Sequence, residues 1–210
     1  TIYNGLDVEK FNIQDRRAAK RAEMGWKDDE PIVIMVAALA EGKGHDLLIE
    51  AVPQIKAAIP NVKIKLAGKG PAADSIKAAA EPYMDVLEFL GERNDIPELL
   101  VASDVLVQTS WAEALPTALM EAGAASIPVV ATDVGGSSEI VVDGETGYIV
   151  PKGDAGAIAR RLADVLNQPE TAASRSSKAR QRIVELFSIE KQDKTTNALY
   201  ERMVSGNRQL

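Results

Sequence analysis

Short apolar segments recur along the chain, and the first of them most constrains the fold. Residues 31–38 read Pro-Ile-Val-Ile-Met-Val-Ala-Ala, without a single polar side chain. A strand with one face in water alternates apolar and polar residues, whereas a strand buried on both faces is continuously apolar. The run therefore predicts a strand inside a parallel sheet that helices cover on both sides.

More segments of this kind follow, and stretches with helical spacing separate them. We expect further strands at 62–66, 86–90, 104–107, 128–131 and 148–150. Apolar residues spaced as on one face of a helix predict helices at 45–58, 75–80, 96–102, 117–125, 155–166, 170–186 and 189–204. Because strands that alternate with helices imply βαβ units, we predict an α/β fold: a Rossmann-like parallel sheet of about six strands with helices on both faces.

Charge and composition exclude several classes of function. The chain has 24 Lys and Arg against 31 Asp and Glu, a formal net charge of -7. A nucleic-acid-binding face is basic, and single strands stack on aromatic side chains, of which this chain has few, so we expect no nucleic acid partner. The chain has no cysteine, which excludes disulfide scaffolds, zinc knuckles and thiol catalysis. This composition fits a reducing compartment, and we expect a cytoplasmic protein.

The hydropathy of the chain bears on whether it crosses a membrane, and its first residues bear on whether it is part of a longer protein. The longest apolar run, residues 31–40, is shorter than the roughly 20 residues that cross a membrane, so we expect no membrane span. The chain starts at Thr1 with no segment that resembles a signal peptide. We therefore expect it to be part of a longer protein.

The loops that follow strands are where such sheets bind ligands. In the first of these loops, Lys43 lies between two glycines and directly before a helix. A helix N-terminus presents free N–H groups and partial positive charge, so an adjacent lysine indicates a phosphate site. The alternative is a flexible loop with a solvated lysine, and for an isolated G-K-G sequence we favour this alternative. The single histidine, His45, lies at the helix start, and we expect it to be exposed rather than catalytic.

A glycine pattern occupies the second loop. Gly68-Lys-Gly-Pro-Ala-Ala fits G-x-G-x-x-[GA], and Glu88 follows in the next strand. This would be a dinucleotide fingerprint, but the fingerprint normally follows the first strand of the fold and this one follows the second. A plain turn is the alternative, and we favour it.

Two carboxylates mark the third loop and its helix. Glu113 precedes a helix whose first turn suits Pro116, and Glu121 lies inside that helix among small apolar residues. A carboxylate in such surroundings needs a partner or access to solvent. Either Glu121 faces water and Glu113 is an acid favoured by the helix dipole, or the two hold a ligand. Spacing alone favours the first interpretation.

The fourth loop contains Gly135 and Gly136, which permit positive φ and close approach of another backbone. Ser137 is in position to cap the short helix that follows. An anion site and a tight turn both remain open for this loop.

Together these motifs resemble the C-terminal, nucleotide-sugar-binding domain of a retaining glycosyltransferase of family 4 (group 1), one half of a GT-B fold. Glu113 and Glu121, with seven residues between them, resemble the family's E-x7-E signature. Lys43-Gly44 resembles its first donor loop, and Gly135-Gly136 with Glu139 resembles a later marker. The similarity extends over nearly the whole chain.

The resemblance implies a division of the chain and a set of partners. Residues 1–29 would form an interdomain linker and a leading helix, residues 30–186 the nucleotide-sugar-binding domain, and residues 187–210 a C-terminal helix. The donor would be a nucleotide diphosphate sugar, and the acceptor would bind to an N-terminal domain that this chain lacks. The sequence has no D-x-D stretch, so we expect no metal and no other cofactor.

The resemblance also assigns roles at the matching positions. Lys43 would contact the diphosphate and Glu113 would hold sugar hydroxyls, which makes these two the expected catalytic residues. Glu121 would bind the ribose, and the backbone around Arg93 would contact the base. The other expected donor-binding residues act through their backbone or through close approach: Gly68, Gly70, Ala114, Leu115, Pro116, Thr117, Gly135 and Gly136.

One position departs from the family pattern. The family usually has Gly-Arg before the leucine of the first loop, and the arginine pairs with the diphosphate; here Ala37-Ala38 precedes Leu39. One charge-assisted contact to phosphate is therefore missing. We expect that this chain binds the donor but transfers little or no sugar alone. The alternatives are an NAD-dependent oxidoreductase domain and a non-enzymatic, degenerate transferase module.

Overall fold

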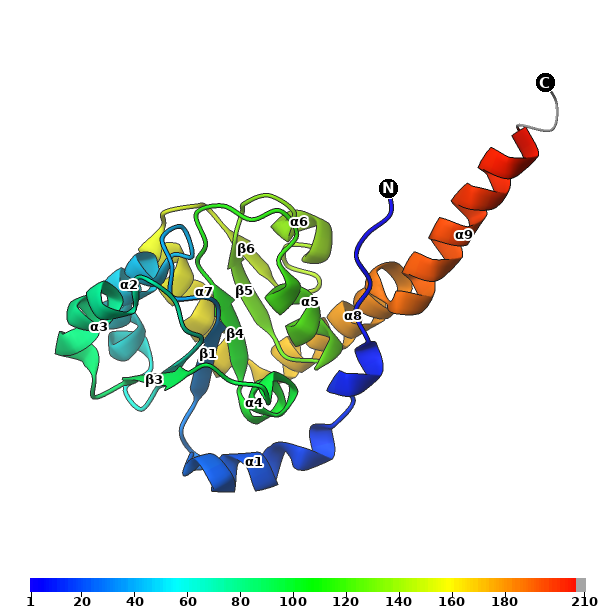
Figure 1. Ribbon diagram of the computed structural model, residues 1–210. Helices are drawn as coiled ribbons and strands as arrows, with labels where there is room; N and C mark the ends of the chain where they lie inside the picture. The colour runs from blue at the N-terminus through cyan, green and yellow to red at the C-terminus, as the bar shows by residue number, and fades with distance from the viewer. Residues whose placement is uncertain (207–210) are drawn as a thin grey trace.

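The computed structural model describes residues 1–206 and confirms the predicted fold class. Its six strands form one parallel sheet in the order β3-β2-β1-β4-β5-β6 (Figure 1). The strands are β1 (Ile32–Val36), β2 (Lys63–Ala67), β3 (Leu87–Gly91), β4 (Val105–Gln108), β5 (Val129–Thr132) and β6 (Tyr148–Val150). Every predicted strand is present, with its ends within two residues of the prediction.

Helices connect the strands, and the helices expected from the spacing of apolar residues are confirmed with ends within two residues. They are α1 (Arg17–Met24), α2 (His45–Ala58), α3 (Ala73–Ala80), α4 (Ile96–Ala102), α5 (Thr117–Ala124), α6 (Ser137–Ile140), α7 (Ala155–Asn167), α8 (Pro169–Phe187) and α9 (Ile189–Gly206). Three short 3₁₀ turns, Val8–Phe11, Gln14–Arg16 and Glu81–Tyr83, complete the described elements.

The strand β1 shows why the continuous apolar run was informative. Val33 and Met35 pack into a core cluster with α2 and α7, whereas Ile32 and Ile34 pack into a second cluster with α4, α5 and α8. All four side chains are at most 1% exposed. Because successive side chains of a strand point to opposite faces, a strand between two helical layers has no position for a polar residue.

The N-terminal segment meets the junction of α8 and α9 at one corner of the molecule. The Leu6 N–H donates to the carbonyl of Phe187 at 2.7 Å, and the Ile189 N–H donates to the carbonyl of Leu6 at 3.1 Å. From this corner α9 projects away from the sheet (Figure 1) and exposes Tyr200 and Met203 by 62% and 61%. Residues 207–210 of the expected C-terminal segment lie outside the described residues.

No helix in residues 1–206 is both long enough and apolar enough to cross a membrane.

Candidate functional site

The order of the strands creates a topological switch point between β1 and β4. These strands are neighbours, but the chain continues from β1 to β2 on one side and from β4 to β5 on the other. In open α/β sheets, a crevice forms at the carboxyl ends of the strands where the order reverses, and ligands bind there. The β1–α2 loop and the β4–α5 loop border this crevice.

Lys43 and Glu113 come from these two loops and form an ion pair across the switch point. Lys43 Nζ lies 2.9 Å from Glu113 Oε1 and 3.1 Å from Oε2. The Ser110 hydroxyl donates to Glu113 Oε1 at 2.7 Å and so fixes the carboxylate further. The lysine side chain is 34% exposed and the glutamate 14%. The Lys43 ammonium can therefore bind an anion such as a phosphate. Beside it, the Glu113 carboxylate oxygens can accept hydrogen bonds from hydroxyl groups.

Gly44 holds the two loops in direct contact. Its φ is 77°, and a Cβ at this position would lie only 1.8 Å from the carbonyl oxygen of Thr109. The Thr109 hydroxyl donates to the Gly44 carbonyl at 2.6 Å, and the Trp111 N–H donates to the Gly42 carbonyl at 2.8 Å. The loop that carries Lys43 and the loop that carries Glu113 are thus fixed to each other through their backbones.

A second glycine contact braces the Glu113 loop from the other side. Gly135 has a φ of 50°, and a Cβ there would lie 1.7 Å from the carbonyl oxygen of Glu113. The Gly136 N–H donates to the Ala114 carbonyl at 2.8 Å. The structure thus shows the close approach of another backbone that these two glycines permit, and an anion site in this loop stays a prediction. Ala114, Leu115 and Pro116 lie in the braced loop, and Thr117 begins α5.

Glu121 lies on α5 and is half-buried. Burial raises the pKa of its carboxyl group from the ordinary 4.5 to about 7. A carboxylate that is costly to ionise in the free protein is the kind of group that functional sites contain.

Glu121→Gln is expected to raise the free energy of unfolding at pH 8 by about 1–3 kcal/mol and to change it little at pH 4. The folded-state pKa of Glu121 is above the unfolded value, so the stability linked to its proton is present below pH 4.5 and is lost as pH rises through about 7. Glutamine does not ionise, so the Glu121→Gln protein does not lose this stability as pH rises. Denaturant unfolding of both proteins at the two pH values measures this. The titration of His45 is common to both proteins and cancels, and an equal difference at pH 4 and pH 8 would contradict the burial argument.

The glycine pattern after β2 serves the packing of loops. A Cβ on Gly68 would lie 1.9 Å from the Ala37 carbonyl oxygen, and one on Gly70 would lie 2.3 Å from that of Leu39. Glu88, the acid required by the dinucleotide interpretation, pairs within the sheet with Lys65 at 2.6 Å. The structure therefore gives the oxidoreductase alternative no support.

Arg93 follows β3 and its side chain is bound within the protein. Its guanidinium donates to both carboxylate oxygens of Asp95, at 2.8 and 2.6 Å, and Lys20 of α1 pairs with the same aspartate at 2.6 Å. These cations, Arg93 foremost, hold the pKa of Asp95 far below its usual value. Only the backbone of this loop is left for the base contact that the resemblance implies.

Two expectations from the sequence are wrong. His45 is buried, with only 2% of its surface exposed, and burial lowers its pKa to about 4. It lies three and seven residues before Leu48 and Val52, on the apolar face of α2, so the spacing could have revealed it. Ser137 does not cap α6: it is the first residue of that helix, and its buried hydroxyl has no hydrogen-bond partner among residues 1–206.

The sequence reasoning also missed residues that shape the site. Ser110 orients Glu113, and its position three residues earlier in the same loop was the available signal. The indole N–H of Trp111 donates to the carboxylate of Asp46 on α2, at 3.1 and 3.2 Å. No local pattern links these two residues, because the contact depends on β1 and β4 being neighbours.

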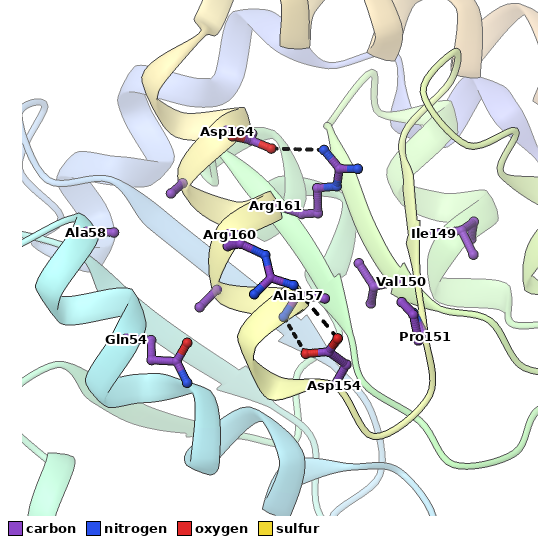
Figure 2. A pocket seen from close by; sticks show the side chains of 12 residues that line it. Gln54, Ala58, Ile149, Val150, Pro151, Asp154, Ala157, Arg160, Arg161 and Asp164 are labelled. Atoms are coloured by element: carbon purple, nitrogen blue, oxygen red, sulfur yellow. Dashed lines mark hydrogen bonds and ion pairs between the residues drawn. The ribbon is translucent and has the colours of Figure 1, made fainter.

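A cavity of about 590 Å³ lies elsewhere, between α2, α7 and the end of β6. Figure 2 shows that its charged side chains face one another: Arg161 pairs with Asp164 at 3.1 Å, and Arg160 lies 3.8 Å from Asp154. Asp154 also caps α7 through the Ala157 N–H at 2.7 Å. These charges are engaged in holding α7, so the switch point is the better candidate site.

Within residues 1–206, no group of three or more His, Cys, Asp or Glu side chains could hold a metal ion.

Comparison with known proteins gives consistent matches. The family model described as glycosyl transferases group 1 matches residues 16–182. The GDP-mannose-dependent alpha-(1-6)-phosphatidylinositol monomannoside mannosyltransferase of Mycolicibacterium smegmatis is 30% identical over 217 residues, which cover 98% of this chain and 56% of the relative. The N-acetyl-alpha-D-glucosaminyl L-malate synthase of Bacillus anthracis is 29% identical over 91% of this chain and 50% of its own length. The chain thus spans about half the length of the curated relatives it matches.

Solved structures agree with the fold. Sucrose-phosphate synthase from Thermosynechococcus elongatus superposes with a TM-score of 0.86 and 28% identity, over 98% of this chain and 52% of that one. S. aureus TarM, crystallised with UDP among other ligands, has a TM-score of 0.76 and 27% identity over 81% of this chain and 35% of its own. The six-stranded sheet is therefore a Rossmann-like half of the GT-B type. Because the family model matches residues 16–182, most of the chain, the chain belongs to the glycosyl transferases of group 1.

Proposed function

We propose that this chain is the donor-binding half of a retaining glycosyltransferase, which binds a nucleotide diphosphate sugar for transfer of the sugar to an acceptor hydroxyl. The observation that supports this most directly is the Lys43–Glu113 pair at the switch point between β1 and β4. The pair combines a cation suited to phosphate with a carboxylate suited to sugar hydroxyls. TarM, a relative in fold, was crystallised with UDP, which agrees with a nucleoside diphosphate as a ligand of this fold.

The chemistry follows from the charges at this edge. Transfer breaks the bond between the anomeric carbon and the diphosphate, so negative charge grows on the leaving group. Preorganised donors aimed at that charge stabilise the transition state. Lys43 and the amino end of α2, which begins at His45, supply such donors. Glu113, held by Ser110, accepts hydrogen bonds from the sugar, and Glu121 accepts them from the ribose hydroxyls.

The acceptor is expected to bind to another half of the protein. The curated relatives that this chain matches are about twice as long as the chain. Helix α9 projects away from the sheet (Figure 1), and its Tyr200, Met203 and Val204 are exposed, as expected if a further domain buries them. Sugar transfer by the complete enzyme would then require both halves.

The second candidate is a degenerate module that binds no donor. The alanine at position 38, in place of the usual arginine, favours it. This candidate predicts that no nucleoside diphosphate binds and that Glu121 is dispensable.

Calorimetric titration with UDP, GDP, ADP and NAD separates these functions. At pH 8, where most of Glu121 is ionised, we expect one nucleoside diphosphate to bind and Glu121→Ala to weaken it about 10- to 100-fold, the effect of a lost hydrogen bond to a charged group. Glu50→Ala, on an exposed position of α2, is the matched control and should leave affinity unchanged. Binding of NAD alone, or of no nucleoside diphosphate, would refute the donor-site proposal.

A further inference from the structure

Lys69, in the loop between β2 and α3, is a cation at the carboxyl edge that the site described above does not use. The β1–α2 loop has Lys43, but it has Ala38 where the family pattern has an arginine for the diphosphate. We propose that Lys69 is the second cation of this site and binds the donor diphosphate beside Lys43, in place of the missing arginine. This inference rests on the proposed function.

The backbone of Lys69 is fixed directly beside the position of the missing arginine. The Leu39 N–H donates to the Lys69 carbonyl at 3.0 Å, and the Ala72 N–H donates to the Leu39 carbonyl at 2.9 Å. A Cβ on Gly68 would lie 3.6 Å from the Cα of Ala38. The backbone of residues 68–69, from which the Lys69 side chain extends, therefore contacts residues 38 and 39 directly.

The side chain of Lys69 is available for a ligand. Its ammonium group lies 2.5 Å from a carboxylate oxygen of Glu92, and the two side chains are 71% and 64% exposed. Such an exposed pair is held weakly in water, and the flexible stem of lysine lets the charge move to a stronger partner. A diphosphate, with more than one negative charge, is such a partner.

The order of the strands places this lysine between the two parts of the donor. Glu92 follows β3 and precedes Arg93, whose backbone is expected at the base, whereas Lys43 follows β1 and is expected at the diphosphate. Because β2 lies between β3 and β1, the loop of Lys69 lies between these two contacts. Lys69 is thus placed toward the end of the diphosphate that is linked to the nucleoside.

The test is a titration of five proteins, Lys43→Ala among them, with the nucleoside diphosphate, among UDP, GDP and ADP, that the unmodified chain binds. Lys69→Ala is expected to weaken binding about tenfold, the effect of one charge-assisted contact. Lys77→Ala, which removes an exposed lysine from α3, is the control and should have no effect. The double variant Lys69→Ala with Ala38→Arg should recover most of the affinity, since residue 38 is exposed and an arginine there meets no packed core.

The outcomes separate this inference from the proposed function. Unchanged affinity in Lys69→Ala, with Lys43 still required, would overturn the role of Lys69 and leave the donor site intact. Failure of Ala38→Arg to recover the affinity would show that the two positions do not serve the same phosphate, and would also overturn it. Absence of binding by the unmodified chain would refute both proposals. The unfolding midpoint of Lys69→Ala without nucleotide should match that of the unmodified chain, which excludes a loss of fold as the cause.

Discussion

Gly44→Ala is expected to lower the free energy of unfolding by about 2–5 kcal/mol and to separate Lys43 from Glu113. With a φ of 77°, Gly44 is in the left-handed region, where an alanine costs roughly 1–2 kcal/mol. The added Cβ would also lie 1.8 Å from the Thr109 carbonyl oxygen, and overpacking costs about 1–3 kcal/mol more. Relief of this clash has to move the two loops apart. Denaturant unfolding measures the change in stability, and nucleotide titration measures the damage to the site.

The same loop provides the control. Gly42 has a φ of 82°, but no atom lies within 4 Å of where its Cβ would be. Gly42→Ala should therefore cost only the roughly 1–2 kcal/mol of the backbone conformation and leave the site intact. If both variants lost the same stability, the contact between Gly44 and Thr109 would not be what holds the loops together.

Lys43→Ala is expected to weaken the binding of a nucleoside diphosphate by about 100-fold. The substitution removes the cation that meets the phosphates, and it leaves the Glu113 carboxylate, only 14% exposed, facing them without its partner. Both effects disfavour an anion. Lys27→Ala, which removes an exposed lysine ahead of β1, serves as the control and should bind normally.

A double variant divides the Lys43 effect into its two causes. In Lys43→Ala with Glu113→Gln, the repelling charge is gone, so the nucleotide should bind several-fold more tightly than to Lys43→Ala alone. Equal affinities would mean that Glu113 does not face the phosphates. Normal binding by Lys43→Ala itself would remove the lysine from the site.

The fold was predictable because its main determinants are local. The apolar run of β1 and the spacing of apolar residues in α2 each reflect burial against neighbours on both sides of a sheet, and a continuous or periodic pattern is the only composition that fits such burial. The ends of elements shifted by a residue or two, since the last hydrogen bonds of a strand or helix depend on the loops that follow.

The sequence could predict individual residues of the site, but it could not predict which of them contact one another in the folded protein. Lys43 and Glu113 are 70 positions apart, and they pair only because β1 and β4 are neighbours, which alternation of strands and helices does not determine. His45 was misjudged because a polar residue at a helix start is usually solvated, whereas here it lies on the buried stripe. Ser137 was misjudged because its hydroxyl is enclosed by the packing of α6 rather than turned to the free N–H groups.

The glycine contacts at the switch point have a consequence for how the sequence can vary. When two side chains collide, a smaller residue or another rotamer at the second position can restore the fit. At Gly44 and Gly135 the colliding partner is instead a carbonyl oxygen, of Thr109 and of Glu113. That oxygen is present whatever amino acid occupies the second position. No compensating substitution can therefore rescue a side chain at either glycine, so these two positions should remain glycine in descendants of this sequence even where the residues they touch are exchanged.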